Sequence, residues 1–351
     1  MPNITAKDLH KLVKDILIAA GASETNADRM GEALVSSSMA GVDTHGVAHL
    51  ATYVSLIKNE ELVPTASPEI VRETANSALV RGNWTFGHVV AEYTMGLAVS
   101  KARDHDIGIA SMVESGHIGR LGEYAEMAVA EGMIGLVLAG GYGAETPVAV
   151  PFGGRKPALH TNPISMGFPA GNETPMFFDF ASTTIAGTKA RLAKNRGEQV
   201  PPGSMVDAYG SPTTDPSDWP DKAALTAFGA HKGYAIMLAN EVIGRVLSGA
   251  DSYADTEKGG STYRHQGVTM IAIKADLFQP QARFEERVDD LERNMRSVPP
   301  AKGFEAVLVP GDLEARAREA RTRDGIPVMD DIWASLTNLA EEFGLALPDV
   351  S

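Results

Sequence analysis

The stretch IGIASMVESGHIGRLGEYAEMAVAEGMIGLVLAGG, residues 107–141, contains two apolar runs with an amphipathic segment between them. The runs 107–115 and 133–141 are short and rich in Ile, Val and Leu, which is typical of buried strands. The segment 117–132 between them predicts a helix. A strand, a helix and a second strand in this order predict an α/β sheet that is at least partly parallel.

The segments around this stretch extend the alternation. Residues 77–83 predict a strand and 88–106 a helix, while 232–249 predict a helix and 266–278 a strand. The polar, Pro- and Gly-rich residues 195–221 predict a long irregular segment, and loops of that length are often functional.

Both ends of the chain predict helices. Residues 5–20 and 23–39 carry apolar residues at helical spacing, and Thr5 and Ser23 suit N-caps. The pattern around Leu336 marks a closing helix. We therefore expect two domains: a helical region, 1–75, joined by 312–351, and an α/β domain over 76–311.

The composition excludes several classes of function. The formal net charge of −14 makes nucleic acid an unsuitable partner. The chain has no cysteine, which excludes disulfides, thiolate metal sites and cysteine nucleophiles. No apolar stretch approaches the roughly 20 residues of a membrane span, and the N-terminus lacks a signal-peptide pattern, so we expect a cytoplasmic protein that binds no membrane.

The common nucleotide-binding and hydrolase fingerprints are absent. There is no GxGxxG after a strand and no GxxxxGK[ST]; the nearest pattern, SGHIGRLG at 115–122, suits a ligand at a helix N-terminus. In GVDTHGVAHL, residues 41–50, His45 and His49 are four apart, which places them on one helix face. Gly46 stands where the HExxH motif has its glutamate. We therefore expect no metal, and a hydrolase using these two histidines is an alternative reading.

Six segments resemble, in chain order, motifs of the malate/L-lactate dehydrogenase type 2 family. This family also contains sulfolactate and ureidoglycolate dehydrogenases, diketogulonate reductase and cyclic ketimine reductases. The segments are VDTHGVAHL (42–50), SGHIGRLGEYAEMA (115–128), HTNPISMGFPA (160–170), DFASTTIAGTKARLAKNRGEQVPPG (179–203), DAYGSPTTDP (207–216) and HKGYAIMLANEVIGRVLSGA (231–250).

The resemblance implies a fold, an activity and an assembly. It implies a sulfolactate dehydrogenase-like, non-Rossmann NAD(P)-binding sheet domain over 76–311, with a helical domain built from both termini. It also implies a homodimer that transfers hydride between NAD or NADP, with NAD favoured, and a small 2-hydroxy acid or 2-oxo acid. Reduction of a cyclic ketimine is the alternative activity.

Oxidation of a 2-hydroxy acid needs a base for the hydroxyl proton and a group that holds the carboxylate. The resemblance implies that either His117 or His45 is the proton carrier. We expect His117, at a predicted strand-to-helix turn, to carry the proton, with His45 orienting the substrate or sharing the proton. His49 stands where the family commonly has arginine, although neutral imidazole cannot hold a carboxylate as a guanidinium does. Ser204 stands where tryptophan is usual. The predicted substrate-binding residues are Thr44, His49, Arg120, Asn162 and Arg264.

The resemblance also assigns residues to the cofactor. Lys232 precedes Gly233 at a predicted helix start, where it would meet a phosphate. Plainer roles stay open: a solvated charge for Lys232, a turn former for Asn162 and a helix cap for Asp179. The predicted cofactor-binding residues are Gly140, Gly141, His160, Thr161, Asn162, Pro163, Asp179, Ala181, Ser182, Thr183, Lys232, Gly233, Gly311 and Asp312.

Overall fold

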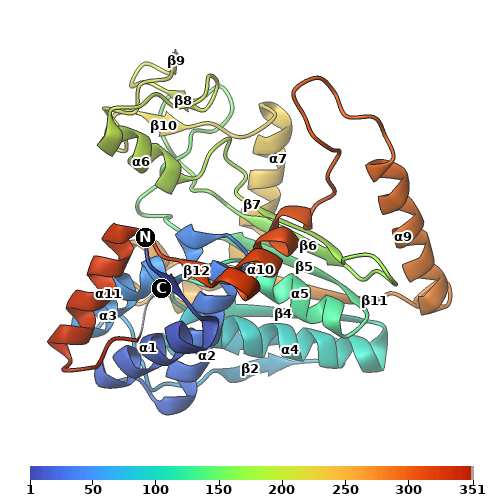
Figure 1. Ribbon diagram of the computed structural model, residues 1–351, viewed down its shortest axis with the longest axis horizontal. Helices are drawn as coiled ribbons and strands as arrows, with labels where there is room; N and C mark the ends of the chain where they lie inside the picture. Colours follow the sequence, from blue (N-terminus) through green and yellow to red (C-terminus); the bar gives the residue numbers. More distant parts are fainter. Residues whose placement is uncertain (349–351) are drawn as a thin grey trace.

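A seven-stranded sheet forms the centre of the computed structural model, which describes residues 1–348 (Figure 1). Residues 349–351, the end of the predicted C-terminal helical region, lie outside the described residues. The strands follow one another across the sheet in the order β2 (Glu69–Glu73), β3 (Ser77–Arg81), β4 (Ile107–Val113), β11 (Gly267–Lys274), β5 (Met133–Gly140), β6 (Ile164–Phe168) and β7 (Met176–Phe180).

The sheet is mixed. β3 and β4 pair in parallel across the helix that joins them, and every other pair in this sheet is antiparallel. The predicted α/β sheet with a parallel part is therefore confirmed. The strands of the quoted stretch are not direct neighbours, because β11 lies between β4 and β5.

Helices cover both faces of the sheet. α4 (Gly87–His105) and α5 (Gly122–Ala130) lie on one face, and α7 (His231–Asn240) with the π-helical turn η3 (Glu241–Val246) lies on the other (Figure 1). Glycines in the strands allow this close packing. A Cβ at Gly135 would lie 2.8 Å from a carbonyl oxygen of α5, and one at Gly140 would lie 2.8 Å from the carbonyl oxygen at the end of α7.

A second core joins the two ends of the chain. It contains α1 (Ala6–Ala19), α2 (Glu24–Met39), α3 (Leu50–Lys58), α11 (Asp330–Glu342) and the strand pair β1 (Asn3–Ile4) with β12 (Ile326–Pro327). The predicted helices 5–20 and 23–39 are confirmed as α1 and α2, with Thr5 and Ser23 accepting hydrogen bonds as N-caps. α10 (Asp312–Asp324) leads from the sheet to β12.

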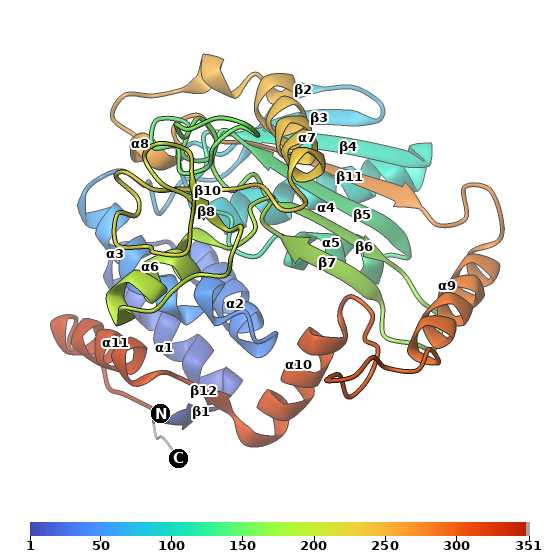
Figure 2. The ribbon, with the colours of Figure 1, turned by 90° about the horizontal axis from the view of Figure 1, so that it is seen from above.

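The predicted irregular segment carries only short elements. α6 (Gly187–Arg196) precedes a small antiparallel sheet of β10 (Ala224–Leu225), β8 (Met205–Val206) and β9 (Pro212–Thr213) (Figure 2). The remaining elements are the turns η1 (Asp43–His45), η2 (Val47–His49) and η4 (Ala250–Tyr253), and the helices α8 (Gly260–Tyr263) and α9 (Gln281–Arg296). Within residues 1–348, no helix is long and apolar enough to cross a membrane.

Candidate active site

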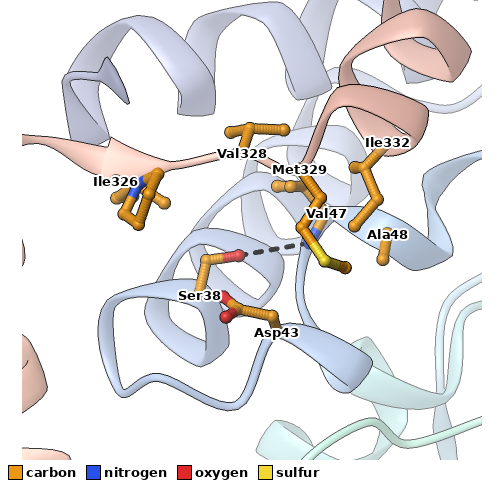
Figure 3. Close-up of a pocket in the computed structure, with 9 residues that line it drawn as sticks. Ser38, Asp43, Val47, Ala48, Ile326, Val328, Met329 and Ile332 are labelled. Atoms are coloured by element: carbon orange, nitrogen blue, oxygen red, sulfur yellow. Dashed lines mark hydrogen bonds between the residues drawn. The ribbon is translucent and has the colours of Figure 1, made fainter. Parts of the chain in front are cut away.

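Two short 3₁₀ turns, η1 and η2, carry His45 and His49. Their four-residue spacing predicted that the two histidines lie on one helix face, but the α-helix begins only at Leu50. Gly46 has a tight packing role, because a Cβ there would lie 2.1 Å from the Ser38 hydroxyl. The same hydroxyl accepts a hydrogen bond from the Val47 N–H at 3.3 Å (Figure 3).

The C-terminal segment holds these turns in place. The carboxylate of Asp43 pairs with both terminal nitrogens of Arg321 on α10, at 2.5 and 2.9 Å. Figure 3 shows the side chains of Ile326, Val328, Met329 and Ile332 beside Val47 around a small pocket. Chain segments almost 300 residues apart therefore fix the turn that carries two of the predicted site histidines.

His117 joins these histidines from the loop between β4 and α5. Its ring centroid lies 5.8 Å from that of His45 and 4.9 Å from that of His49. The Tyr53 hydroxyl, on α3, is hydrogen-bonded to Nδ1 of His117 at 2.8 Å. If Nδ1 carries the hydrogen and donates it to Tyr53, Nε2 is left as a proton acceptor.

Burial keeps these imidazoles neutral. Desolvation, followed by the neighbouring rings of His49 and His45, lowers the pKa of His117 well below its usual value. Desolvation, then His49 and Arg120, lowers the pKa of His45 to about 4. Desolvation also lowers the pKa of His49, although a hydrogen bond to the Thr44 carbonyl opposes it. All three rings are therefore uncharged at pH 7.

Aromatic side chains that the sequence analysis did not single out surround the histidines. The Tyr263 and Tyr142 ring centroids lie 6.1 and 6.4 Å from that of His117, and Tyr142 packs edge-on against His160 at 4.1 Å. The ring of His88, fully buried in α4, lies edge-on to that of His117, with the ring centroids 6.2 Å apart. No local motif surrounds these residues, so only the folded chain reveals them.

Both predicted substrate-binding arginines are held by other groups. Arg264 forms two hydrogen bonds with the Glu145 carboxylate, at 2.8 and 2.9 Å, and two with backbone carbonyls. Arg120 is 2% exposed and pairs with Glu126, and its guanidinium lies over the Phe177 ring. Its Nε and Nη1 are buried without a partner in the described chain.

The side chains of Thr44 and Asn162 differ in solvent exposure and in hydrogen bonding. The Thr44 side chain is exposed, and its hydroxyl lies 3.1 Å from Nδ1 of His45. Asn162 is buried, with φ +36°; its amide nitrogen donates to Glu241 at 2.6 Å and its amide oxygen accepts from the His160 N–H at 3.2 Å. Its side chain therefore organises the loop around it.

Four of the predicted cofactor residues, Asp179 and Ala181–Thr183, lie on β7 and the loop after it, and the others come from several elements. The Ser182 N–H donates to the Thr161 carbonyl at 2.8 Å, and Thr183 forms a β-bridge with Ala227, shortly before Lys232 on α7. Ala181 belongs to the same loop, and the Pro163 carbonyl accepts a hydrogen bond from β5. At the other end of β7, the Phe177 N–H donates to the carbonyl of Pro310, beside Gly311.

Several of these residues also have clear structural roles. Asp179 accepts a hydrogen bond from the Gly122 N–H at 2.8 Å, and desolvation raises its pKa to about 6. Asp312 pairs with Arg296. A Cβ at Gly141 would lie 1.9 Å from the His265 carbonyl oxygen, and one at Gly233 would lie 1.8 Å from that of Phe228. These two glycines, like Gly140, permit close packing within the protein.

The residues present fit a dinucleotide. Lys232 is exposed in the first turn of α7 and forms no ion pair within residues 1–348. The N-terminus of α7 and the Lys232 ammonium are therefore close together, and both favour an anion. Beside Lys232, Thr184, Gly229 and Ala230 line a hollow of about 610 Å³, within the range of small-molecule and cofactor sites. The described chain has no group of three or more His, Cys, Asp or Glu that could hold a metal ion.

The family model for malate/L-lactate dehydrogenase matches residues 4–337. The chain belongs to the malate/L-lactate dehydrogenase family. The family's L-sulfolactate dehydrogenase from Methanothermobacter thermautotrophicus is 32% identical over 98% of each chain, and the L-lactate dehydrogenase from Cupriavidus necator is 33% identical over 98% of this chain and 99% of its own. The crystal structure of malate dehydrogenase from Entamoeba histolytica superposes with a TM-score of 0.92, at 26% identity, over 99% of this chain and all of its own.

Family membership makes this chain a dehydrogenase, as the ordered motifs predicted. The rings of His45, His49, His117 and His160, called the ring cluster from here on, lie on three of those motifs: η1 and η2 belong to the first, His117 to the second and His160 to the third.

Proposed function

We propose that this dehydrogenase oxidises a small 2-hydroxy acid to the 2-oxo acid, and catalyses the reverse reaction, with His117 as the proton carrier. The observation that carries the proposal is the neutral His117 ring, hydrogen-bonded to Tyr53 and packed against His45 and His49. A neutral imidazole that can accept a proton at one nitrogen and donate from the other suits this reaction.

The chemistry follows from these contacts. Nε2 of His117 accepts the hydroxyl proton while the hydrogen on Nδ1 stays bonded to Tyr53, which stabilises the resulting imidazolium. His45 and its neighbour Thr44 orient the substrate hydroxyl. A nicotinamide cofactor, when bound, would supply the acceptor for the hydride from C2. Water is restricted by the Tyr142 and Tyr263 rings, which lie beside His117.

We propose NAD or NADP as the cofactor, with NAD favoured, in a binding mode different from the Rossmann type. Lys232 and the first turn of α7 would hold the diphosphate, and the loop residues Thr161 and Ser182–Thr183 would contact the rest of the cofactor. Supporting this are the exposed Lys232, which has no ion pair within residues 1–348, and the backbone hydrogen bonds that join Thr161 to Ser182 and Ser182 to Phe228, just before α7. In this arrangement the cofactor-binding domain is 76–311, and the helical domain is 1–75 with 312–351.

We also propose a homodimer. A stripe of apolar side chains on α7 and η3 points away from the sheet: Leu238, Val242 and Val246 are 39%, 55% and 63% exposed. Their four-residue spacing places them on one helix face. A second copy of the same stripe would cover this surface from water in a two-fold arrangement.

A panel of 2-hydroxy acids, 2-oxo acids and cyclic imines, tested with both cofactors at 340 nm, tests the activity. We expect His117→Asn to lower kcat at least about a hundredfold, because the general base contributes that much or more. NADH binding, followed by fluorescence, should be unchanged. His105→Asn, an exposed histidine on α4, is the matched control. Turnover of imines alone would favour the ketimine activity, and full activity of His117→Asn would contradict the proposal.

A further inference from the structure

Residues 250–266, called the strap from here on, lie between η3 and β11 in the chain and carry Tyr263. The Tyr263 ring centroid lies 6.1 Å from that of His117 and 5.5 Å from that of Tyr142. The strap contains only two short helical turns, η4 and α8, and Gly259 between them has a φ of +71°. Because such short helices are only marginally stable alone, contacts with other segments must hold Tyr263 in place.

Glu145, in the loop after β5, holds the strap at the two residues that follow Tyr263. Nη1 of Arg264 donates to both oxygens of the Glu145 carboxylate, at 2.8 and 2.9 Å, and Nε2 of His265 lies 3.1 Å from Oε1. The hydrogen bond from Arg264 lowers the pKa of Glu145, which is therefore ionised at pH 7. Hydrogen bonds between ionised groups are stronger than neutral ones, so this attachment fixes the direction of the strap at Tyr263.

Glu145 is also what joins these two side chains to the rest of the protein. Their other hydrogen-bond partners within residues 1–348 belong to the strap itself: the carbonyls of Asp255 and Thr256 for Arg264, and the carboxylate of Asp251 for His265. Without the Glu145 carboxylate, Arg264 and His265 would still bond their own segment but would no longer hold it against the loop after β5.

The loop that carries Glu145 also carries Tyr142. The Gly143 N–H donates to the Thr262 carbonyl at 2.6 Å, so a backbone hydrogen bond joins the residues next to the two tyrosines. The Tyr142 ring centroid lies 6.4 Å from that of His117. The bonds of Glu145 and Gly143 therefore hold both tyrosine rings beside His117.

Further contacts attach the strap on either side of this point. One is made by the Gly259 N–H, which donates to the Glu61 carbonyl at 3.1 Å. Another is made by the amide of Gln266, which is 3% exposed and donates to the Gly116 carbonyl at 2.9 Å. Neither contact depends on Glu145, so the loss of its carboxylate should loosen the segment between them and leave the strap attached.

We propose that Glu145 is a positioning residue for the dehydrogenase reaction, acting through the strap to hold the Tyr263 and Tyr142 rings beside His117. The assignment rests on the proposed function, because it presumes that His117 exchanges a proton with the substrate. With both rings held, the substrate hydroxyl can approach His117 in only a narrow range of orientations. A misplacement of about 1 Å in such an arrangement can lower a rate by about a hundredfold.

The test compares Glu145→Ala and Glu145→Gln with Glu131→Ala. Glu131 is likewise partly exposed and ion-paired, with Arg103 at 2.6 Å, which makes it the matched control. The measurements are kcat and KM for the best 2-hydroxy acid and the dissociation constant of NADH. We expect Glu145→Ala to lower kcat about ten- to a hundredfold, with NADH affinity unchanged. Glu145→Gln keeps an oxygen that can accept from Arg264 and should recover part of the loss, and Glu131→Ala should match wild type.

Combination with Tyr263→Ala shows whether Glu145 acts through this ring. Tyr263→Ala alone should lower kcat to a similar extent. Losses from independent sites multiply, whereas losses that act through one shared group do not. The double variant Glu145→Ala with Tyr263→Ala should therefore have a kcat within about threefold of the lower single variant.

The outcomes separate this assignment from the proposed function. Wild-type turnover of 2-hydroxy acids together with an unchanged kcat in Glu145→Ala overturns the assignment alone, as does a double variant whose loss equals the product of the two single losses. Should circular dichroism show Glu145→Ala to be unfolded, the same two comparisons are made with Glu145→Gln. A wild-type protein that turns over no 2-hydroxy acid overturns both.

Discussion

Acidification should destabilise this protein partly through His45, and the size of the effect follows from its burial. The pKa of His45 is about 4 in the folded chain and 6.5 when the ring is exposed. Between these values the unfolded chain binds more protons than the folded one, so stability falls as the pH decreases through this window. At pH 5 the loss relative to pH 8 is about 2 kcal/mol for this single ring.

Urea unfolding of wild type and His45→Gln at pH 8 and pH 5 measures this loss. Other groups titrate in both proteins, so the informative quantity is the difference between their two pH-dependent changes in unfolding free energy. The variant should lose about 2 kcal/mol less than wild type on acidification. His105→Gln, which removes an exposed ring, should behave as wild type. Equal losses in wild type and His45→Gln would refute the reasoning, as would a ¹³C NMR titration of His45 with a pKa near 6.5.

Four further predictions concern catalysis, its pH dependence, the support of the site and assembly. Tyr53→Phe leaves Nδ1 of buried His117 without its partner, so we expect kcat to fall about ten- to a hundredfold with a smaller change in KM; a kcat within twofold of wild type would contradict this role. Because the pKa of His117 is lowered, kcat/KM for oxidation should stay level from pH 8 to pH 6, whereas an acid limb centred at 6.5 would indicate an ordinary exposed histidine. Arg321→Gln removes the ion pair with Asp43, and urea unfolding should show a loss of about 1–2 kcal/mol, a change below 0.5 kcal/mol being evidence against this support. Val242→Asp should convert a dimer to a monomer in light scattering, and an unchanged mass would exclude this face.

Local sequence patterns predicted most of the helices and strands, because these elements are formed by residues close together in the chain. The apolar spacing of Leu9, Leu12 and Ile16 predicted α1, and those residues are buried. The run QGVTMIAIKADLF predicted β11 as a strand, but its place between β4 and β5 depends on pairing across more than a hundred residues. The helix α9 was missed although Phe284, Val288, Leu291 and Met295 recur at helical spacing, so the sequence carried a signal for it.

Site residues that belong to a sequence motif could be predicted, whereas site residues that only the folded chain brings together could not. His45, His49 and His117 came from motif positions, and the structure brings their rings together. Tyr53, His88 and Tyr263 reach the same place from α3, α4 and α8, with no local signal. Arg264 had the right chemistry for a carboxylate, but its commitment to Glu145, 119 positions earlier, is visible only in the folded chain.

The central claim is direct hydride transfer between a nicotinamide and C2 of a 2-hydroxy acid, with the proton carried by His117. It is tested most directly by following, at 340 nm and by mass spectrometry, the oxidation of a 2-hydroxy acid that carries deuterium at C2, by wild type and His117→Asn. We predict reduced cofactor containing the deuterium from wild type, and a rate at least about a hundredfold lower from the variant with cofactor affinity unchanged. Reduced cofactor without deuterium, or equal rates for the two proteins, would contradict the claim.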